Sequence, residues 1–539
     1  MTDGRERKFW GWGYEGEGPT RAQQESMGRT LGERFGIADL TVTEPPAIGE
    51  LDLPAPRVTP PDSLADRCRT DTEARAGHTY GKSFRDIVRG FSRDFPHPPD
   101  VVAYPREEAD VVAVLDWCAD AGIAAIPYGG GSSVVGGVEA DVGDAYAGAV
   151  SIDLGGLGRV VELDRTSRAA RIQAGVYGPA LEDQLRPHGL TLRHYPQSFE
   201  FSTLGGWIAT RSGGHYATLY THIDEFVEAL RVVTPQGIIE TRRLPGSGAG
   251  PSPDRMFCGS EGTLGVITEA WMRLQDRPTF RATATARFDS FEAGVDAARA
   301  ISQSGLNPAN CRLIDAGEAL ITGAGDGSAH LLLIGFESAD HPLDAGLARA
   351  VECARDHGGS VDDARSTGSG PATGAREGSA GAWRNAFVRA PYTRDALVGL
   401  GLVNETFETA TTWDRFSALY ESTMAAVRGA MQAVGAEPGL VTCRFTHVYP
   451  DGPAPYFTVI AAGASAPQAR LEQWAVIKEA AADALIAHGG TITHHHAVGR
   501  DHRPWYDRQR PDLFADALRA AKRTVDPTAI LNPGVLIDP

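Results

Sequence analysis

The fold class of this chain is indicated by one segment, Pro127-Tyr128-Gly129-Gly130-Gly131-Ser132-Ser133-Val134-Val135-Gly136-Gly137. It continues from the apolar run 122–127, which predicts a short buried strand. Three consecutive glycines can adopt positive φ and turn their N–H groups toward an anion such as a pyrophosphate. The spacing matches neither GxGxxG nor GxxxxGK[ST], which excludes the Rossmann and P-loop motifs. A tight turn in a glycine-rich chain remains the alternative.

The residues around this loop predict an α+β domain over 97–276. Upstream, 101–103 form a short strand, and apolar residues recur at helical spacing over 105–118. Downstream, 151–176 contains short apolar or alternating runs separated by Gly and Asp, and 230–241 predicts a hairpin through Pro-Gln-Gly. The glycine loop therefore closes a β-α-β unit.

A second α+β domain is predicted over 277–510. Strand patterns at 281–288 and 330–336 alternate with helical patterns at 290–303 and 343–356, and a long amphipathic helix covers 467–488. Residues 357–382 are poor in apolar side chains and predict a flexible loop. Residues 1–96 predict an N-terminal arm with short helices, and 511–539 a C-terminal tail that returns to the first domain.

Composition limits the function further. The chain has 539 residues, a net charge of −18 and 63 glycines, well above the typical glycine share of about 7%. Excess negative charge repels phosphate backbones, so nucleic acid is not an expected partner. Six cysteines without a CxxC pair and an N-terminus without an apolar core predict a cytoplasmic protein. Its basic residues are almost all arginine, which we interpret as the composition of a bacterial genome.

Three further segments combine small residues with hydroxyl groups: 197–206, 210–213 and 259–268. With the glycine loop, in this order and spacing, they resemble the FAD-binding domain of the vanillyl-alcohol oxidase and p-cresol methylhydroxylase type. The resemblance implies a two-subdomain FAD-binding domain followed by a substrate (cap) domain with an antiparallel sheet. It implies that FAD contacts Pro127, Tyr128, Gly129, Gly130, Gly131, Ser132, Ser133, Gln197, Ser198, Phe199, Glu200, Phe201, Ser202, Thr203, Gly205, Thr210, Arg211, Ser212, Gly213, Glu261, Gly262, Thr263, Leu264, Gly265, Val266 and Ile267.

Motifs of the second half narrow the resemblance. The segments are Trp383-Arg384, Tyr392-Thr393-Arg394-Asp395, 405–415, Tyr449 with Tyr456-Phe457, and Gly489-Gly490-Thr491-Ile492-Thr493-His494-His495-His496-Ala497-Val498-Gly499. Together they resemble the alkyldihydroxyacetonephosphate synthase family, whose members are FAD enzymes of ether-lipid synthesis. The resemblance implies that flavin N5 displaces the fatty acid from acyl-dihydroxyacetone phosphate and that a long-chain alcohol then displaces the flavin.

The resemblance also implies roles for individual residues. Tyr456 would be the acid/base at the reacting carbon, and His494, His495 and His496 would support substrate activation; imidazole titrates near neutral pH. Arg394 and Arg312 would bind substrate, because a guanidinium offers a bidentate fork to phosphate. No His or Cys lies within 128–138, so FAD is expected to be non-covalent. His215, in Arg211-Ser212-Gly213-Gly214-His215, imitates a covalent attachment motif, and we interpret this segment as a FAD contact. Homodimerisation and peripheral membrane contact are further expectations.

One rival function stays open. FAD-dependent 2-hydroxyacid dehydrogenases or oxidases, acting on D-lactate or glycolate, share the FAD domain and carry a His-rich segment at the corresponding place. In a strand, His494 and His496 would lie on one face at metal-ligand spacing, and Glu405 and Glu408 could complete a zinc site. The main interpretation includes no metal.

Overall fold

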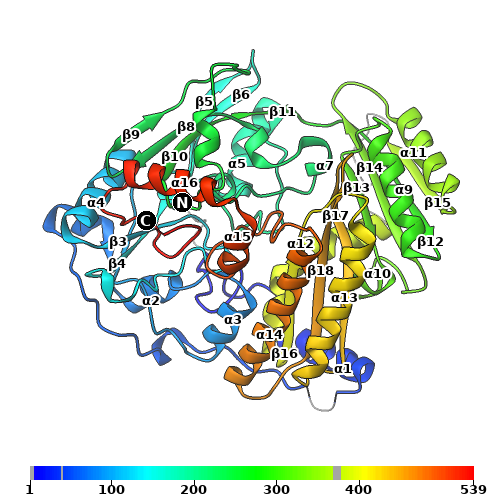
Figure 1. Cartoon of the computed structure of the whole chain (residues 1–539), viewed down its shortest axis with the longest axis horizontal. Helices are drawn as coiled ribbons and strands as arrows, with labels where there is room; N and C mark the ends of the chain where they lie inside the picture. The colour runs from blue at the N-terminus through cyan, green and yellow to red at the C-terminus, as the bar shows by residue number, and fades with distance from the viewer. Residues whose placement is uncertain (1–4, 38–39, 368–377, 539) are drawn as a thin grey trace.

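The glycine loop lies at the end of a small, mainly parallel sheet (Figure 1). The computed structural model describes residues 5–37, 40–367 and 378–538. Two parallel strand pairs, β2 with β4 and β3 with β4, confirm the predicted β-α-β unit, and its crossover helix is α4 (Glu108–Ala121). The strand order is β1 (Cys68–Arg69), β2 (Val101–Ala103), β4 (Ala149–Asp153) and β3 (Ala124–Tyr128).

A second sheet, wholly antiparallel, completes the FAD-type half of the chain. Its order is β5 (Val160–Asp164), β6 (Ala169–Gln173), β10 (Val266–Arg273), β8 (Val227–Thr234) and β9 (Gly237–Glu240). The predicted hairpin is β8–β9. Short elements surround it: α5 (Gly178–Leu185), α6 (Leu204–Thr210), α7 (Ala217–Tyr220), α8 (Pro253–Phe257) and the pair β7 (Leu190–Thr191) and β11 (Gln275–Asp276). The sheet buries Ile172, Leu230 and Met272 against Leu204 and Trp207 of α6.

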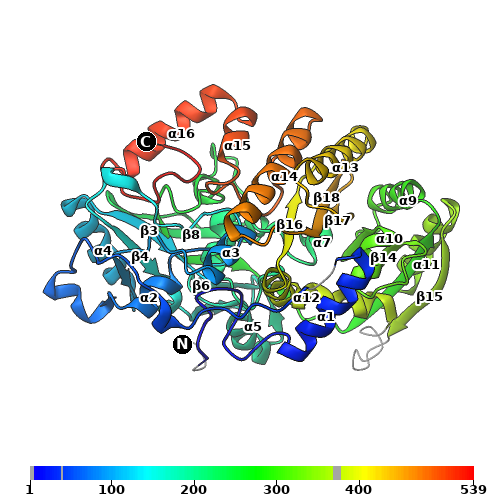
Figure 2. The same ribbon diagram turned by 90° about the horizontal axis from the view of Figure 1, so that it is seen from below.

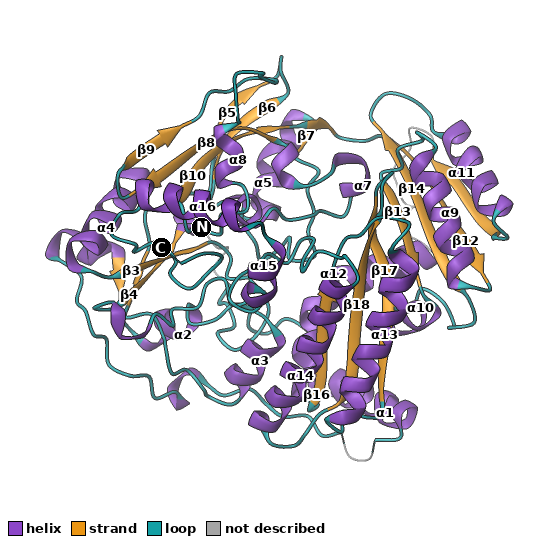
Figure 3. Ribbon diagram, viewed as in Figure 1, coloured by secondary structure: helices purple, strands orange, loops and turns teal. Residues whose placement is uncertain are grey.

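The second half folds around an antiparallel sheet of seven strands (Figure 3). Its order is β15 (Ser360–Thr367), β12 (Phe280–Phe288), β14 (His330–Ser338), β13 (Asn310–Ile314), β17 (Gly439–Val448), β18 (Pro453–Ala462) and β16 (Leu402–Glu408). Period-two burial is clear in β12, where Ala282, Ala284, Ala286 and Phe288 are buried. The predicted fold class, an α+β FAD-binding domain with an antiparallel substrate domain, is confirmed.

Helices cover both faces of this sheet. Figure 2 shows α14 and α12 on opposite sides of β16. The helices are α9 (Phe291–Gln303), α10 (Ala316–Ile321), α11 (Asp344–Asp356), α12 (Gly378–Gly399), α13 (Phe416–Ala433) and α14 (Pro467–Ala487). Among the described residues, no helix combines the length and the apolar character that crossing a bilayer requires.

The loop predicted over 357–382 is wrong for most of its described residues. Strand β15 occupies 360–367 and α12 begins at residue 378, while 368–377 lie outside the described residues. An edge strand needs few apolar side chains because it pairs on one side only, here with β12. Low apolar content therefore did not distinguish it from a loop.

The N-terminal arm packs against α12. It contains α1 (Arg21–Phe35), α2 (Thr72–Gly77) and α3 (Phe84–Phe91). The backbone N–H of Trp12 donates to both carboxylate oxygens of Asp395, at 3.1 and 2.9 Å, and Lys8 Nζ lies 3.7 Å from the same carboxylate. A side chain at Gly11 would collide with Asp395. The arm therefore fixes α12, which carries Arg394.

The C-terminal residues lie against β3. Ala125 N–H donates to Ile530 O at 2.8 Å, and Asn532 N–H donates to Ala125 O at 2.9 Å. Before them come α15 (Arg503–Gln509) and α16 (Asp512–Val525). Lys522 of α16 is fully buried and its Nζ donates to Asp526 Oδ2 and to the carbonyls of Thr263 and Leu531, at 2.7 to 2.9 Å. The domain boundaries at 96, 276 and 510 stay predictions.

Replacing Lys522 should destabilise this junction. In Lys522→Met the Asp526 carboxylate and two carbonyls lose their shared cation inside the protein, a loss of about 3–5 kcal/mol. We expect a lower thermal unfolding midpoint, measured by circular dichroism. Arg523→Met, on the exposed side of the same helix, is the control and should change stability by less than about 0.5 kcal/mol. Equal midpoints for the two variants would contradict the assigned role of Lys522.

Candidate functional site

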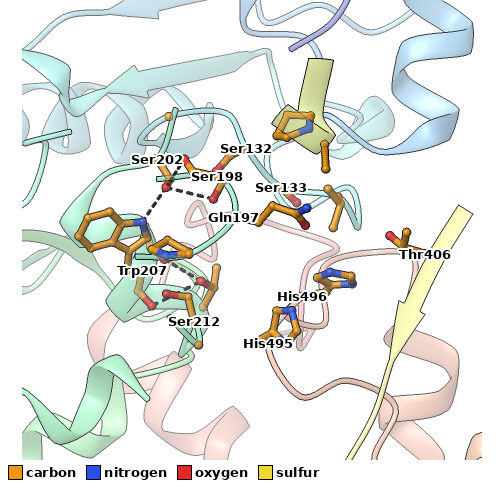
Figure 4. A pocket seen from close by; sticks show the side chains of 18 of the residues that line it. Ser132, Ser133, Gln197, Ser198, Ser202, Trp207, Ser212, Thr406, His495 and His496 are labelled. Atoms are coloured by element: carbon orange, nitrogen blue, oxygen red, sulfur yellow. Dashed lines mark hydrogen bonds between the residues drawn. The ribbon is translucent and has the colours of Figure 1, made fainter. Parts of the chain in front are cut away.

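One cavity of about 390 Å³ joins the glycine loop to the seven-stranded sheet (Figure 4). It brings together segments that are more than 300 residues apart in the sequence. The predicted site residues that line it are Pro127, Tyr128, Gly129, Gly130, Gly131, Ser132, Ser133, Gln197, Ser198, Ser202, Thr203, Gly205, Thr210, Ser212, Gly213, Glu261, Gly262, Gly265, Ile267, Arg312, Arg394, Tyr456, His495 and His496.

The other predicted residues lie beside the cavity and do not line it: Phe199, Glu200, Phe201, Arg211, Thr263, Leu264, Val266 and His494. Phe201 packs against Trp12 and Tyr14 of the arm, and Leu264 is buried in the core beneath the site. Arg211 forms an ion pair with Asp224. Sequence motifs include such neighbours because only part of each segment faces a ligand.

The glycine loop is packed too closely for any side chain. A Cβ on Gly130 would lie 1.8 Å from the Phe201 carbonyl oxygen, and one on Gly129 2.3 Å from Thr203 Oγ1. Gly131 has φ +64°. Arg7 of the arm donates to the Gly130 carbonyl at 3.1 Å, which fixes the loop from outside. The result is a bare, preorganised backbone of the kind that a dinucleotide pyrophosphate requires.

Hydroxyl groups and one buried carboxyl group complete this half of the cavity. Trp207 Nε1 donates to Ser202 Oγ at 2.6 Å, as Figure 4 shows. The Glu261 carboxylate accepts the N–H groups of Val498 and Gly499 at 2.9 and 2.8 Å. Burial raises the pKa of Glu261 to about 7 and outweighs those two hydrogen bonds. Glu261 thus connects the fourth FAD-type segment to the residues that follow the histidine triplet.

Tyr456 lies on β18 directly opposite Arg444 of β17. The Arg444 guanidinium lies 3.8 Å from the centre of the tyrosine ring, and it forms an ion pair with Glu318 of α10. Burial tends to lower the pKa of Arg444, but Glu318 and Tyr456 outweigh it and raise that pKa. The register of the two strands thus places a cation against the face of the Tyr456 ring, with Glu318 as its counter-ion.

Arg312 lines the cavity but its donors are already engaged. Nη2 donates to the Thr446 carbonyl at 3.1 Å, Nη1 contacts His215 Nδ1 at 3.2 Å, and the guanidinium stacks on Trp383 at 4.0 Å. Burial, followed by repulsion from Arg444, lowers the Arg312 pKa to about 9, so it stays cationic at neutral pH. The structure therefore places a positive charge here rather than a free guanidinium fork.

Arg394 is more available. It lies on α12, and its Nη2 donates to Thr406 Oγ1 of β16 at 2.7 Å. Asp395, the next residue, is held by the arm, and burial raises its pKa to about 7. The Asp395 carboxylate is directed to Trp12 N–H, and Arg394 acts on it as a nearby charge.

The backbone of the histidine triplet is held by Glu408, at the end of β16. This carboxylate is 1% exposed. It accepts N–H groups from His494 at 2.6 Å, His495 at 3.2 Å and His496 at 3.0 Å, and the hydroxyl of Thr493 at 2.6 Å. Burial lowers the pKa of all three imidazoles, most strongly for His494 and His496. The triplet therefore presents neutral rings, and His495 and His496 lie side by side in Figure 4.

His494 points away from the cavity toward Tyr449, which belongs to one of the motifs of the resemblance, and His222, which the sequence did not suggest. His222 Nε2 lies 3.0 Å and the Tyr449 hydroxyl 2.8 Å from His494 Nε2. His494 Nδ1 lies 3.1 Å from His495 Nδ1. These contacts form a chain of imidazoles that leads from the cavity outward.

The carboxylates of the zinc hypothesis have other partners. Glu405 accepts from Trp474 Nε1 at 2.6 Å and Lys478 Nζ at 3.2 Å, and Glu408 binds the triplet backbone. Among the described residues, ring nitrogens of His447, His494 and His495 lie within 4.8 Å of one another. The Nε2–H of His447 donates to the Gly214 carbonyl at 2.8 Å and leaves its buried Nδ1 without a hydrogen-bond partner, whereas both nitrogens of His494 have partners. Both carboxylates of the zinc hypothesis are therefore engaged elsewhere, and only the three rings remain as candidate ligands.

Three site residues carried no recognisable signal in the sequence: Arg444, His447 and His222. Arg444 is one of many arginines, and its importance follows from strand register. His447 lies near the end of β17, and it comes beside His494 of the triplet only once the sheet has formed. Arg444 could have been found by predicting a hairpin between 439–448 and the strand of Tyr456 and asking which residue pairs with Tyr456.

Comparison with known proteins supports an FAD-binding domain followed by a second, substrate domain. The family model "FAD binding domain" matches residues 99–242, and "FAD linked oxidases, C-terminal domain" matches 277–536. FAD is therefore the cofactor of this family of enzymes. A crystal structure of an alkyldihydroxyacetonephosphate synthase superposes with a TM-score of 0.79 at 26% identity over 98% of both chains.

Curated relatives correct one prediction and settle the family. The alkyldihydroxyacetonephosphate synthase of Trypanosoma brucei brucei is 30% identical over 90% of this chain and 82% of its own length. That of Dictyostelium discoideum is 31% identical over 88% and 79%. Both organisms are eukaryotes, so the bacterial source inferred from the arginine content is wrong. The chain belongs to the alkyldihydroxyacetonephosphate synthase family.

Proposed function

We propose that this chain is an FAD-dependent alkyl transferase that exchanges the acyl group of acyl-dihydroxyacetone phosphate for a long-chain alcohol. The observation that carries the proposal is the single cavity in which the glycine loop meets Tyr456, His495 and Arg394. A cofactor seated on the loop would have the acid/base group and a phosphate-binding cation within the same enclosure.

The glycine cradle fits FAD because Gly129, Gly130 and Gly131 line the cavity with backbone alone, and their close packing against residues 201–203 and Tyr128 allows no side chain at these positions. We propose that segments 127–133, 197–206, 210–213 and 261–267 hold it. When bound, FAD supplies the nucleophile that allows the two oxygen substituents to exchange without net oxidation or reduction. We expect non-covalent binding: the loop has no His or Cys, and His215 is engaged by Asn310 and Arg312.

The surrounding side chains would bind substrate and move protons. Arg394 would take the phosphate through its free donors, and Arg312 would add positive charge. Tyr456 would exchange the proton at the reacting carbon, and Arg444, which packs against its ring, would hold the ring in position. Ile321, Phe387 and Leu397 form an apolar part of the lining that suits a hydrocarbon chain.

The rival 2-hydroxyacid dehydrogenase or oxidase retains the support of the family model for FAD linked oxidases. The site favours the transferase because Glu405 and Glu408 have structural partners and do not complete a metal site with the triplet.

Membrane contact, oligomeric state and cellular location are proposed on grounds other than the cavity. We propose peripheral membrane contact because both substrates are lipids, and because Leu513 and Phe514 at the start of α16 are 83% and 53% exposed. The homodimer and the cytoplasmic location rest on the sequence and remain predictions.

The transferase proposal is tested by supplying acyl-dihydroxyacetone phosphate and hexadecanol to the purified FAD-loaded protein without an electron acceptor. We expect the ether product and free fatty acid in equal amounts, measured by mass spectrometry. Reduction of a dye by D-lactate or glycolate, with no ether formed, would instead establish the rival function.

Removing the Tyr456 hydroxyl should abolish the chemistry and preserve the cofactor. In Tyr456→Phe we expect kcat to fall by about 10²–10⁴ because an acid/base group is lost. The FAD content, read from visible absorbance, should equal that of the wild type. Tyr420→Phe, a partly buried tyrosine of α13 that packs against the core cluster, is the control and should keep its activity. A Tyr456→Phe enzyme with wild-type kcat would refute the assigned role.

Arg394 should govern affinity for the phosphate. We expect Arg394→Met to raise KM for acyl-dihydroxyacetone phosphate about 10–100-fold, since a hydrogen bond to a charged group contributes about 1.5–3 kcal/mol. KM for the alcohol should change little. Arg389→Met, an exposed arginine on the same helix, is the matched control. An equal rise in KM for both substrates would point to disruption of α12 rather than to lost phosphate binding.

A further inference from the structure

The imidazole chain behind the cavity runs from His495, which lines the cavity, through His494 to His222 and Tyr449, which do not. Its consecutive contacts are 3.1 Å from His495 Nδ1 to His494 Nδ1 and 3.0 Å from His494 Nε2 to His222 Nε2. The Tyr449 hydroxyl bridges the second step, at 2.8 Å from His494 Nε2 and 3.2 Å from His222 Nε2. Every step is short enough for a hydrogen bond.

One backbone carbonyl sets the direction of these hydrogen bonds. His222 Nδ1 lies 2.9 Å from the carbonyl oxygen of Arg211, which can only accept, so Nδ1 carries the proton. In neutral His222, Nε2 is then an acceptor, and it must receive from His494 Nε2–H or from the Tyr449 hydroxyl. His494 Nδ1 is left as an acceptor for His495 Nδ1–H. The last free lone pair of the chain is therefore on His495 Nε2, at the cavity end.

The rings are neutral at rest. Burial lowers the pKa of His222, although the Arg211 carbonyl and Asp224 oppose it. Burial also lowers the pKa of His495, which Glu408 opposes, and that of His494 still further. A chain of neutral imidazoles can accept a proton at one end and deliver a proton at the other.

We propose that His495, His494 and His222, with Tyr449 bridging the outer step, form a proton relay between the cavity and the surface. This relay rests on the proposed function. A proton taken by His495 Nε2 would displace Nδ1–H to His494 Nδ1, and His494 Nε2–H would pass to His222 Nε2 directly or through the hydroxyl. His222, then protonated on both nitrogens, would release its Nδ1 proton to solvent beside the exposed Arg211 carbonyl, and the three rings would return to their resting tautomers before the next turnover. His222 is partly exposed, and Tyr449 lines a surface groove with Asp451 and Arg415.

The exchange creates the proton that needs to leave. The C–O bond to the acyl oxygen breaks, the O–H bond of the alcohol breaks, and a new C–O bond forms to the alcohol oxygen. A fatty acid with an ordinary carboxyl pKa leaves as the carboxylate at neutral pH. One proton per turnover therefore remains in the enclosed cavity, no electrons are gained or lost overall, and the relay gives the proton an exit.

The test compares His222→Gln, His222→Ala and the exposed control His188→Ala as FAD-loaded proteins in the ether-forming assay. We expect kcat to fall at least about tenfold in both His222 variants, with KM for either substrate unchanged within about twofold. FAD absorbance and the thermal midpoint serve as checks of folding. Tyr449→Phe keeps the direct 3.0 Å contact and should lose less than the His222 variants.

Imidazole in the buffer separates a relay from a structural role. A diffusible base should restore kcat in His222→Ala, which has a vacant position for it. It should not restore kcat in His222→Gln, where the amide fills that position, and it should leave His188→Ala unchanged. Full kcat in both His222 variants, a loss that imidazole does not restore in His222→Ala, or one zinc ion bound stoichiometrically by these histidines would each overturn the relay. If the wild type forms no ether, the proposed function fails and the relay fails with it; if the wild type forms ether, the His222 results decide the relay alone.

Discussion

The Glu408 carboxylate accepts N–H groups from three consecutive residues, His494, His495 and His496, and this interaction sets the geometry of the whole reactive half. Glu408 is the last residue of β16 and pairs across the sheet with Tyr456 of β18. The same residue therefore fixes where the triplet lies relative to the tyrosine. A buried carboxylate is stable only when its lone pairs are satisfied, so the triplet backbone stabilises Glu408 as much as Glu408 orders the triplet.

A second buried carboxyl group acts on the same segment from the other domain. Glu261 belongs to the FAD-type half and accepts the N–H groups of Val498 and Gly499, which follow the triplet after Ala497. Residues 494–499 are thus held at one end by the substrate sheet and at the other by the glycine-rich cradle. Positions in the cavity are consequently defined between the two domains and not within either one. This explains why a loop without regular secondary structure can present three neighbouring rings in fixed orientations.

The sequence was sufficient for features whose cause is local. The glycine loop was recognisable because a bare backbone after a strand, together with three further segments of small residues, is typical of a dinucleotide site. Two strands of the second half, β12 and β14, followed from the strand patterns at 281–288 and 330–336. Arg444 was not recognisable, because its contact with Tyr456 depends on the register of β17 against β18. His222 and His447 come from different domains and meet His494 only after folding. Residues 360–367 were predicted as a loop although they form the edge strand β15, because an edge strand that pairs only with β12 can be poor in apolar side chains.

Charge in the cavity differs in sign from charge on the whole chain. The molecule carries a net charge of −18, which would repel a phosphate monoester at long range. Inside the cavity, Arg312, Arg394 and Arg444 provide cations, whereas Glu408 lies behind the triplet and Glu318 pairs with Arg444. Salt screens the long-range field over about 8 Å at physiological ionic strength, while the enclosed arginines act at contact distance. Neutral imidazoles are consistent with this arrangement: charged histidines beside three arginines would add repulsion, and burial removes that charge. The cavity can thus bind an anion and still offer lone pairs that accept a proton.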